Sequence, residues 1–249
     1  MFQDMSGASK SELWTYRRLE HPGVVEASDW RGSNCPSLVH HFHHEPQITA
    51  VASGNRWFKI GRRTYQISEG CFAVIPARIP HTSVGKIGRS TVSRDVFINP
   101  AALEDEAEHL LFGRLPKGMI NDENATVQLV LHAVRLRYLR RIPALCSQSI
   151  PAEILEAVRS GQDTISDLAR SVHLSREGFI RKFDREIGMT PYAYRLAERV
   201  SLARAKLRNG ETPVSAAYEV GFADQSHLGR VFRKAFGTTP ARFRQAWRV

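Results

Sequence analysis

The sequence predicts an α+β protein of two domains, an antiparallel β-barrel or sandwich followed by an all-helical domain. Three observations support this. Residues 51–99 alternate short runs of β-branched and aromatic residues with Gly or Pro every eight to twelve positions. From residue 151 onward the pattern is helical, and within it two stretches repeat. Between the halves, residues 141–153 hold two prolines and few charges, which is typical of a domain boundary.

Composition places the chain among soluble globular proteins. It has 249 residues, of which 42% are hydrophobic and 24% charged, and it holds no apolar run long enough to span a membrane. The first residues show no secretory signal, so we expect a cytoplasmic protein. Cys35, Cys71 and Cys146 are scattered, so we expect reduced thiols and neither a disulfide framework nor a zinc site.

The net charge of +10 favours a polyanionic partner, usually nucleic acid. Charge alone leaves a merely basic surface as the alternative. The basic excess per residue is higher in the last hundred residues, where arginine dominates. Arginine suits the recognition of phosphate and guanine because its donors form a planar fork.

In chain order, the β-pattern predicts strands within 51–61, 62–70, 71–85 and 90–99. Pro100 then opens a predicted helix over 101–112, and a second helix is predicted over 126–141. Val127, Leu131, Val134 and Tyr138 share one face of the second helix. That face packs onto the sheet or pairs two subunits, and the pattern does not choose between them. The predicted domains are 1–141 and 153–249, joined by a linker at 142–152.

The two similar stretches in the helical half, 179–195 and 228–244, align without a gap. Gly188 matches Gly237, and the Thr-Pro pairs at 190–191 and 239–240 match each other. Such a repeat implies two copies of one structural unit.

Each copy predicts a short helix, a tight turn and a second helix with its own N-terminal cap, Ser175 in the first copy and Asp224 in the second. The second turn is one residue longer than the first. Apolar side chains recur at helical spacing and should face the core. They are Phe179, Phe183 and Ile187 in the first copy and Leu228, Phe232 and Phe236 in the second.

This arrangement is a duplicated helix-turn-helix, with an ordinary helical domain as the lesser alternative. Gln and Arg side chains face outward. These side chains can form two hydrogen bonds at once with the edge of an adenine or a guanine. Capped helix starts and flanking basic residues can hold phosphates. The linking helix from Pro191 should fix the spacing of the two units, so that they enter successive major grooves. The residues expected at DNA are Ser175, Arg176, Glu177, Ile180, Arg181, Lys182, Gln225, Ser226, His227, Arg230 and Arg233.

The stretch GFADQSHLGRVFRKAFGTTPARFR at 221–244 resembles the C-terminal signature of the AraC family of bacterial transcription regulators, and residues 165–244 resemble its whole DNA-binding domain. The resemblance implies base contacts at the outward positions near the start of each second helix. By position these are Glu177, Ile180 and Arg181, then Gln225, Ser226 and Arg230. Glu177 and Ile180 are unusual base readers, so we expect the second unit to hold more of the specificity. His227 would either contact a DNA phosphate or pack against neighbouring side chains.

The segment HHFHHEPQ at 40–47 and His81 supply histidines that can converge from two strands. Three such histidines could bind a divalent metal. Residues 40–99 also resemble a cupin barrel, the sensory half common in the AraC family. His41, His43 and His81 match its motifs, but Gln47 stands where the family has a metal-binding Glu. We therefore expect a metal-free effector pocket formed by His41, His43, Gln47, Trp57 and His81. A metal site, or histidines that only hydrogen-bond inside the barrel, are the alternatives.

No catalytic motif is found, so we expect no enzyme and no cofactor. The sequence predicts a transcription regulator that binds double-stranded DNA and a small-molecule effector as a homodimer, with RNA polymerase left open as a partner. Effector binding would bias the interdomain contacts and reorient the DNA-binding domain. The alternatives are a metal-dependent cupin enzyme, a metal-sensing regulator using His41, His43 and His81, and a DNA-repair or architectural protein with a reactive cysteine.

Overall fold

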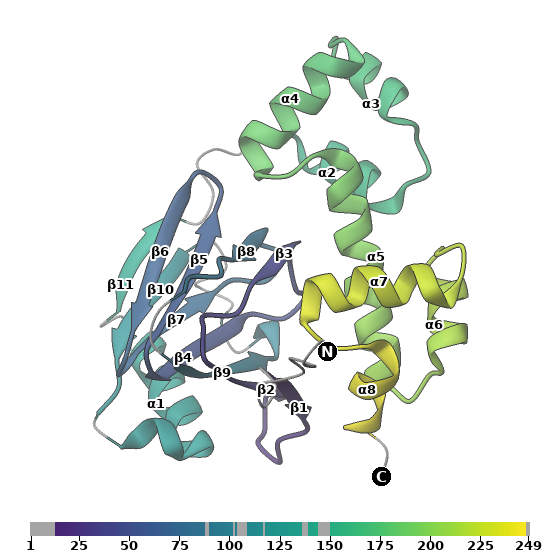
Figure 1. The fold of residues 1–249 in the computed structure, drawn as a ribbon. Helices are drawn as coiled ribbons and strands as arrows, with labels where there is room; N and C mark the ends of the chain where they lie inside the picture. The colour runs from purple at the N-terminus through teal and green to yellow at the C-terminus, as the bar shows by residue number, and fades with distance from the viewer. Residues whose placement is uncertain are drawn as a thin grey trace, which may run out of the picture.

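The computed structural model describes residues 13–87, 90–101, 103, 109–116, 118–135, 139–143 and 150–247. A β-rich unit and a helical unit lie side by side and touch, with helix α7 next to strand β3 (Figure 1). This confirms the predicted two-domain α+β class. In the described part of the chain, no helix is both long enough and apolar enough to cross a membrane.

Two antiparallel sheets build the β-unit. The larger has the order β1-β2-β9-β4-β7-β10-β11, and the smaller has the order β3-β8-β5-β6. The first five strands are β1 (Leu13–Arg17), β2 (Val24–Gly32), β3 (Leu38–His41), β4 (Gln47–Ser53) and β5 (Asn55–Ile60). The others are β6 (Arg63–Ser68), β7 (Cys71–Ile75), β8 (His81–Ser83), β9 (Thr91–Ile98), β10 (His109–Arg114) and β11 (Arg140–Pro143). Every strand predicted between residues 51 and 99 is present.

The two faces of β4 show why the barrel forms. Ile48 and Ala50 point away from the barrel interior. They join a hydrophobic core that includes Val127 and Val130 of helix α1 (Glu123–Arg135). Residues at alternate positions, Gln47 and Thr49, point to the other side and are also buried. The sheet is therefore covered on both faces. Helix α1 packs onto the sheet, which was one of the two predicted alternatives for its apolar face.

Two expectations about residues 101–143 are wrong, the helix over 101–112 and the full length of the helix over 126–141. His109–Arg114 is a strand, because it pairs with β7 on one side and β11 on the other and buries Leu110 and Leu111. The second helix ends by Arg135, and Arg140–Pro143 is again a strand. The sheet thus continues past the expected boundary at residue 141. Tyr138 and residues 144–149 of the expected linker lie outside the described residues.

The helical unit begins with α2 (Ala152–Ser160) and contains the two predicted repeats. The first is α3 (Ile165–Ser171) with α4 (Arg176–Ile187), and the second is α6 (Pro213–Glu219) with α7 (Gln225–Phe236). Helix α5 (Pro191–Arg208) links them, and α8 (Pro240–Gln245) follows the second. All six predicted inward side chains of α4 and α7 are buried.

Matching caps give the two units the same geometry. Ser175 Oγ accepts from the Gly178 amide at the start of α4, and the Asp224 carboxylate accepts from the His227 amide at the start of α7. Gly188 and Gly237 end these helices in the left-handed region, with φ of 88° and 70°. The sequence repeat is therefore a repeat of backbone geometry.

Gly237 also lies where the two domains meet, against Trp14 of β1. A Cβ added at Gly237 would lie 2.1 Å from a Trp14 ring carbon. Next to it, the Tyr16 hydroxyl donates to the Phe236 carbonyl over 2.6 Å. Only a residue without a side chain fits here.

We therefore expect Gly237→Ala to destabilise the full chain by more than the roughly 1–2 kcal/mol that left-handed backbone costs an L-residue. Gly161→Ala is the matched control, since Gly161 has a φ of 71° and its Cβ would meet nothing closer than 3.9 Å. Urea unfolding measures both. Equal losses would show that the contact with Trp14 adds nothing.

Candidate nucleic-acid interface and barrel interior

Helix α4 presents a polar face on the side opposite its aromatic core. Glu177 and Arg181 are exposed, and Ile180 lies half-buried between them. Ser175 and Arg176 at the helix start are exposed, and Lys182 is half-buried. The Arg176 guanidinium lies 3.4 Å from the Glu177 carboxylate, so this acid is partly neutralised. Arg181 forms no ion pair within the described part of the chain and is the side chain of this face best able to meet an anion.

Helix α7 presents the equivalent face with a different composition. Gln225, Ser226, Arg230 and Arg233 are all exposed. His227 is half-buried, and its ring packs edge-on against Phe222 with the centroids 5.1 Å apart. Of the two interpretations of His227, packing is the one this geometry favours. The face of α7 holds an amide, a hydroxyl and two guanidinium groups free to meet another molecule.

Arg195 and Arg244, which occupy matching positions at the ends of the two repeats, stabilise the helical domain. Arg195 donates from Nε to the Val158 carbonyl over 2.8 Å, and Arg244 donates from Nε to the Gly210 carbonyl over 3.0 Å. Each ties the end of its unit to a neighbouring segment. Their recurrence in the repeat thus has a structural cause.

The three candidate histidines of the barrel do converge. Ring centroids lie 4.8 Å apart for His41 and His43, and 4.5 Å apart for His41 and His81. All three side chains are buried. Nδ1 of His41 and Nδ1 of His81 lie 2.7 and 2.8 Å from the carbonyls of Val39 and Ile79, so each carries its proton there and leaves Nε2 as an acceptor.

A divalent metal fits this group only in part. The ligand atoms lie within 4.8 Å of one another, and backbone carbonyls orient two rings as they do in metal sites. However, His43 Nδ1 lies 2.8 Å from Nη1 of Arg204, so it accepts from a guanidinium whose charge opposes a cation. Gln47 supplies a neutral amide that donates to Thr49 over 2.9 Å. As formed, the cluster suits neutral histidines better than a metal.

Trp57 does not belong to this group, which corrects the expectation that it neighbours the histidines. Along β5 the side chains of Arg56, Phe58 and Ile60 are buried, and Trp57 points to the opposite face. Its ring lies under the Lys86 ammonium at 3.4 Å from the centroid. Phe58 takes the expected place, with its ring centroid 5.8 Å from that of His81.

The barrel interior is polar well beyond the histidines. Arg56 is fully buried, and its guanidinium lies 3.6 Å from the Asp95 carboxylate and 3.3 Å from Ser93 Oγ. Among the described residues, several buried atoms here have no hydrogen-bond partner, namely Ser28 Oγ, Arg56 Nε and His81 Nε2. Buried polar groups are normally satisfied, so these atoms offer unused hydrogen-bonding positions to a molecule that enters the barrel.

An arginine of the helical domain reaches into this barrel. Arg204 of α5 is 2% exposed, and its guanidinium meets the fully buried Glu26 carboxylate through Nε at 3.1 Å and through a second, shorter contact from Nη2. It also lies over the Phe97 ring, 4.0 Å from the centroid. Burial alone would lower the pKa of Arg204, but Glu26 and Glu45 raise it above its usual value. The cation of one domain is thus buried against the acid of the other.

Neighbouring contacts extend the same interface. Arg208 donates to Glu26 over 3.2 Å and to Glu45 over 2.6 Å. Ser201 Oγ donates to the Phe42 carbonyl over 2.7 Å. Glu198 lies 3.1 Å from His44 and 3.5 Å from Arg78. The sequence analysis did not predict this interface, because no sequence motif marks an arginine of a linking helix as one that will be buried against another domain.

Comparisons with known proteins agree with both halves. The family model of the AraC-like ligand binding domain matches residues 24–108, and that of a helix-turn-helix domain matches residues 168–246. The chain is 25% identical to an uncharacterized HTH-type transcriptional regulator of Bacillus subtilis, YbfI, over 82% of this chain and 86% of that protein. It is 27% identical to the arabinose operon regulatory protein of Escherichia coli, over 54% of this chain and 50% of that protein.

A solved structure of ToxT from Vibrio cholerae, with an unsaturated fatty acid bound, has the same fold. The TM-score is 0.59 at 13% sequence identity, and the match covers 91% of this chain and 96% of that one. At this identity the likeness concerns the fold alone.

We expect Arg204→Met to destabilise the full chain by about 3 kcal/mol, because it leaves Glu26 buried with only Arg208 as a cationic partner. Arg204→Met combined with Glu26→Leu should recover most of that loss, since the fully buried carboxylate is then gone and Arg208, which is partly exposed, keeps Glu45 as its partner. Urea unfolding of both variants measures the difference. A double variant no more stable than the single one would show that the ion pair is not what matters.

The histidine cluster predicts acid sensitivity. Burial holds the pKa of His41 and His43 well below the ordinary 6.5, and that of His81 at about 4. Between pH 6.5 and 5 the unfolded chain therefore binds protons that the folded chain does not, so stability falls as the pH falls. Each histidine contributes at most about 1.4 kcal/mol per pH unit.

The free energy of unfolding between pH 5 and 7 tests this. His81→Phe should flatten the pH dependence, and His132→Phe, at an exposed position of α1, should leave it unchanged. Identical slopes in all three proteins would contradict the assignment.

Proposed function

Because this chain belongs to the AraC family of transcription regulators, with a ligand-binding domain and a helix-turn-helix DNA-binding domain, we propose that α4 and α7 read successive major grooves of one operator. The observation that carries the proposal is the pair of identically capped helices with exposed polar faces. Helix α5 joins the two units as one continuous helix, which keeps their spacing fixed.

The two helices would contribute unequally to specificity. In α7, Gln225, Ser226 and Arg230 offer an amide, a hydroxyl and a guanidinium for base edges. In α4, Arg181 is the main candidate, since Glu177 repels phosphates and Ile180 can offer only apolar contact. Basic residues beside these faces would bind the DNA backbone, namely Arg176, Lys182 and Arg233.

The effector is proposed to act at the barrel mouth, where Arg204 now meets Glu26 and His43. A ligand that enters among His41, His43 and His81 must share this space with the guanidinium. Ligand binding and docking of the helical domain would then be coupled through the difference in ligand affinity between the docked and released states. Structures of ToxT hold an unsaturated fatty acid and a naphthalenyl butenoic acid, which makes carboxylic acids the first class to test.

The proposed DNA-binding function implies further partners. Operator binding favours a homodimer, in which two copies read a symmetric site, and activation would bring RNA polymerase into contact. A chromosomal target places the protein in the cytoplasm. Whether the regulator activates or represses depends on where its operator lies.

For DNA, we expect Arg230→Ala to cost about 1–3 kcal/mol of binding to a duplex selected by the full-length protein, with discrimination relaxed at one base pair. Arg31→Ala, at an exposed position of β2, is the control and should bind normally. Binding of the unaltered protein should weaken steeply with salt, because neutralised phosphates release counterions. Fluorescence anisotropy measures both effects. A salt-independent affinity would exclude DNA as the partner.

For the effector, we expect oleate below its micellar concentration to stabilise the full chain, by about 2.7 kcal/mol at one hundred times its Kd. His41→Phe should remove the stabilisation, whereas His132→Phe should keep it. Thermal unfolding with and without ligand is the measurement. Stabilisation that survives in His41→Phe would place the ligand outside the barrel.

A further inference from the structure

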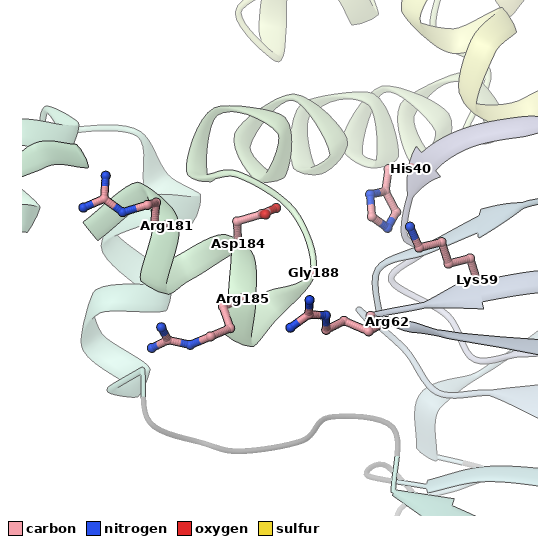
Figure 2. Close-up of a pocket in the computed structure, with 8 residues that line it drawn as sticks. His40, Lys59, Arg62, Arg181, Asp184, Arg185 and Gly188 are labelled. Carbon is pink, nitrogen blue, oxygen red and sulfur yellow. The ribbon is translucent and has the colours of Figure 1, made fainter. Parts of the chain in front are cut away.

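A second cavity lies at the other contact between the domains, where the turn joining β5 to β6 meets the end of α4. It encloses about 550 Å³. Lys59, Gly61 and Arg62 line it from the barrel, and Arg181, Arg185 and Gly188 line it from α4 (Figure 2). The cavity is separate from the barrel mouth, since its lining includes neither Arg204 nor the three clustered histidines.

The lining carries a strong excess of positive charge. Lys59, Arg62, Arg181 and Arg185 contribute four cations, and Asp184 is the one carboxylate of the lining. All four cationic side chains are exposed. Within the described residues, Lys59, Arg62 and Arg181 form no ion pair. In Figure 2, Lys59 and Arg62 extend toward α4, whereas the guanidinium groups of Arg181 and Arg185 point away from the barrel and would rotate inward to reach an anion in the cavity. Like charges brought around one space repel each other, and an anion between them would offset that repulsion.

The side of the cavity formed by β3 holds a polar atom without a partner. His40 Nε2 is buried and makes no hydrogen bond in the described part of the chain. Its ring points from β3 toward the cavity and lies beside Lys59 (Figure 2). Burial and the Lys59 charge lower the pKa of His40, so its ring is neutral while the cavity holds no anion. An oxyanion beside Nε2 would satisfy this atom by accepting a hydrogen bond from it, and its negative charge would favour the imidazolium form, which takes its proton from the solvent.

Two glycines keep the cavity narrow at the point where the domains touch. A Cβ on Gly188 would lie 3.3 Å from the Gly61 Cα, and both glycines have positive φ, of 88° and 55°. Small residues at both positions let the backbone turns approach closely. The turn between β5 and β6 and the end of α4 are therefore held close together beside the cavity.

We propose that this cavity binds a compact oxyanion of two or more charges, which ties the barrel to the first helix-turn-helix. DNA backbone is the less suitable occupant, because a duplex is too wide to enter a cavity of about 550 Å³ and approach the buried His40 Nε2. Arginine forks and a lysine match the oxygens of phosphate or carboxylate groups.

The site has a regulatory consequence that rests on the DNA-binding function proposed above. Arg181 lines the cavity and is also the main candidate base reader of α4. An anion bound to Arg181 withdraws it from DNA and holds α4 against the barrel. By linkage, the anion weakens DNA binding and DNA weakens anion binding by the same factor.

Isothermal titration of the full chain with pyrophosphate, and separately with citrate, tests the site without DNA. We expect one bound anion per chain, with the stronger response telling phosphate from carboxylate ligands. Arg62→Ala should weaken binding at least tenfold. Arg63→Ala is the matched control, because Arg63 is the adjacent exposed arginine and does not line the cavity. No binding of either anion, or equal losses in both variants, would overturn the proposal.

Anisotropy with a selected duplex, at matched ionic strength, tests the coupling. We expect the preferred anion to lower DNA affinity of the unaltered protein and of Arg63→Ala, and to have no effect on Arg62→Ala. If Arg62→Ala instead loses DNA affinity in the absence of anion, the turn contacts DNA and the proposal is wrong. A protein that binds the anion but no duplex would refute the DNA-binding function and leave the site intact.

Discussion

The burial of Arg204 against Glu26 is the constraint on which the arrangement of the two domains depends. Neither charge is tolerable alone in the interior, since each has given up its hydration. Glu26 lies inside the barrel and Arg204 lies on the linking helix, so the chain can satisfy both only by docking one domain on the other. His43 and Arg208 complete the pairing, which makes the domain contact specific in position.

The same contact joins sensing to DNA recognition. Helix α5 carries Arg204 and also sets the spacing between α4 and α7. A change at the barrel mouth therefore acts on the one element that both recognition helices share. A second domain contact, between the turn joining β5 to β6 and the end of α4, gives the first recognition helix its own connection to the barrel (Figure 1).

Local rules explain the helical domain almost completely. Caps at Ser175, Thr190, Asp224 and Thr239, glycine ends and aromatic spacing each depend on residues a few positions apart. Because the unit occurs twice, each of these local features is seen at two matching positions. In the barrel the strands between 51 and 99 follow from the same kind of pattern. His109–Arg114 does not, because its acidic and leucine-rich surroundings favour a helix and only pairing with β7 and β11 makes it a strand.

By itself, then, the sequence determined the fold class, the two helix-turn-helix units, their outward residues and the histidines that converge in the barrel. These follow from periodicity and spacing, which are local. The tertiary structure decided that Trp57 faces away from the histidines, that Arg204 enters the barrel, and that His40 and α4 line the same cavity. Glu26 and Arg204 are 178 residues apart, and no local pattern specifies which buried charge will meet which. That choice arises only when the folded domains pack.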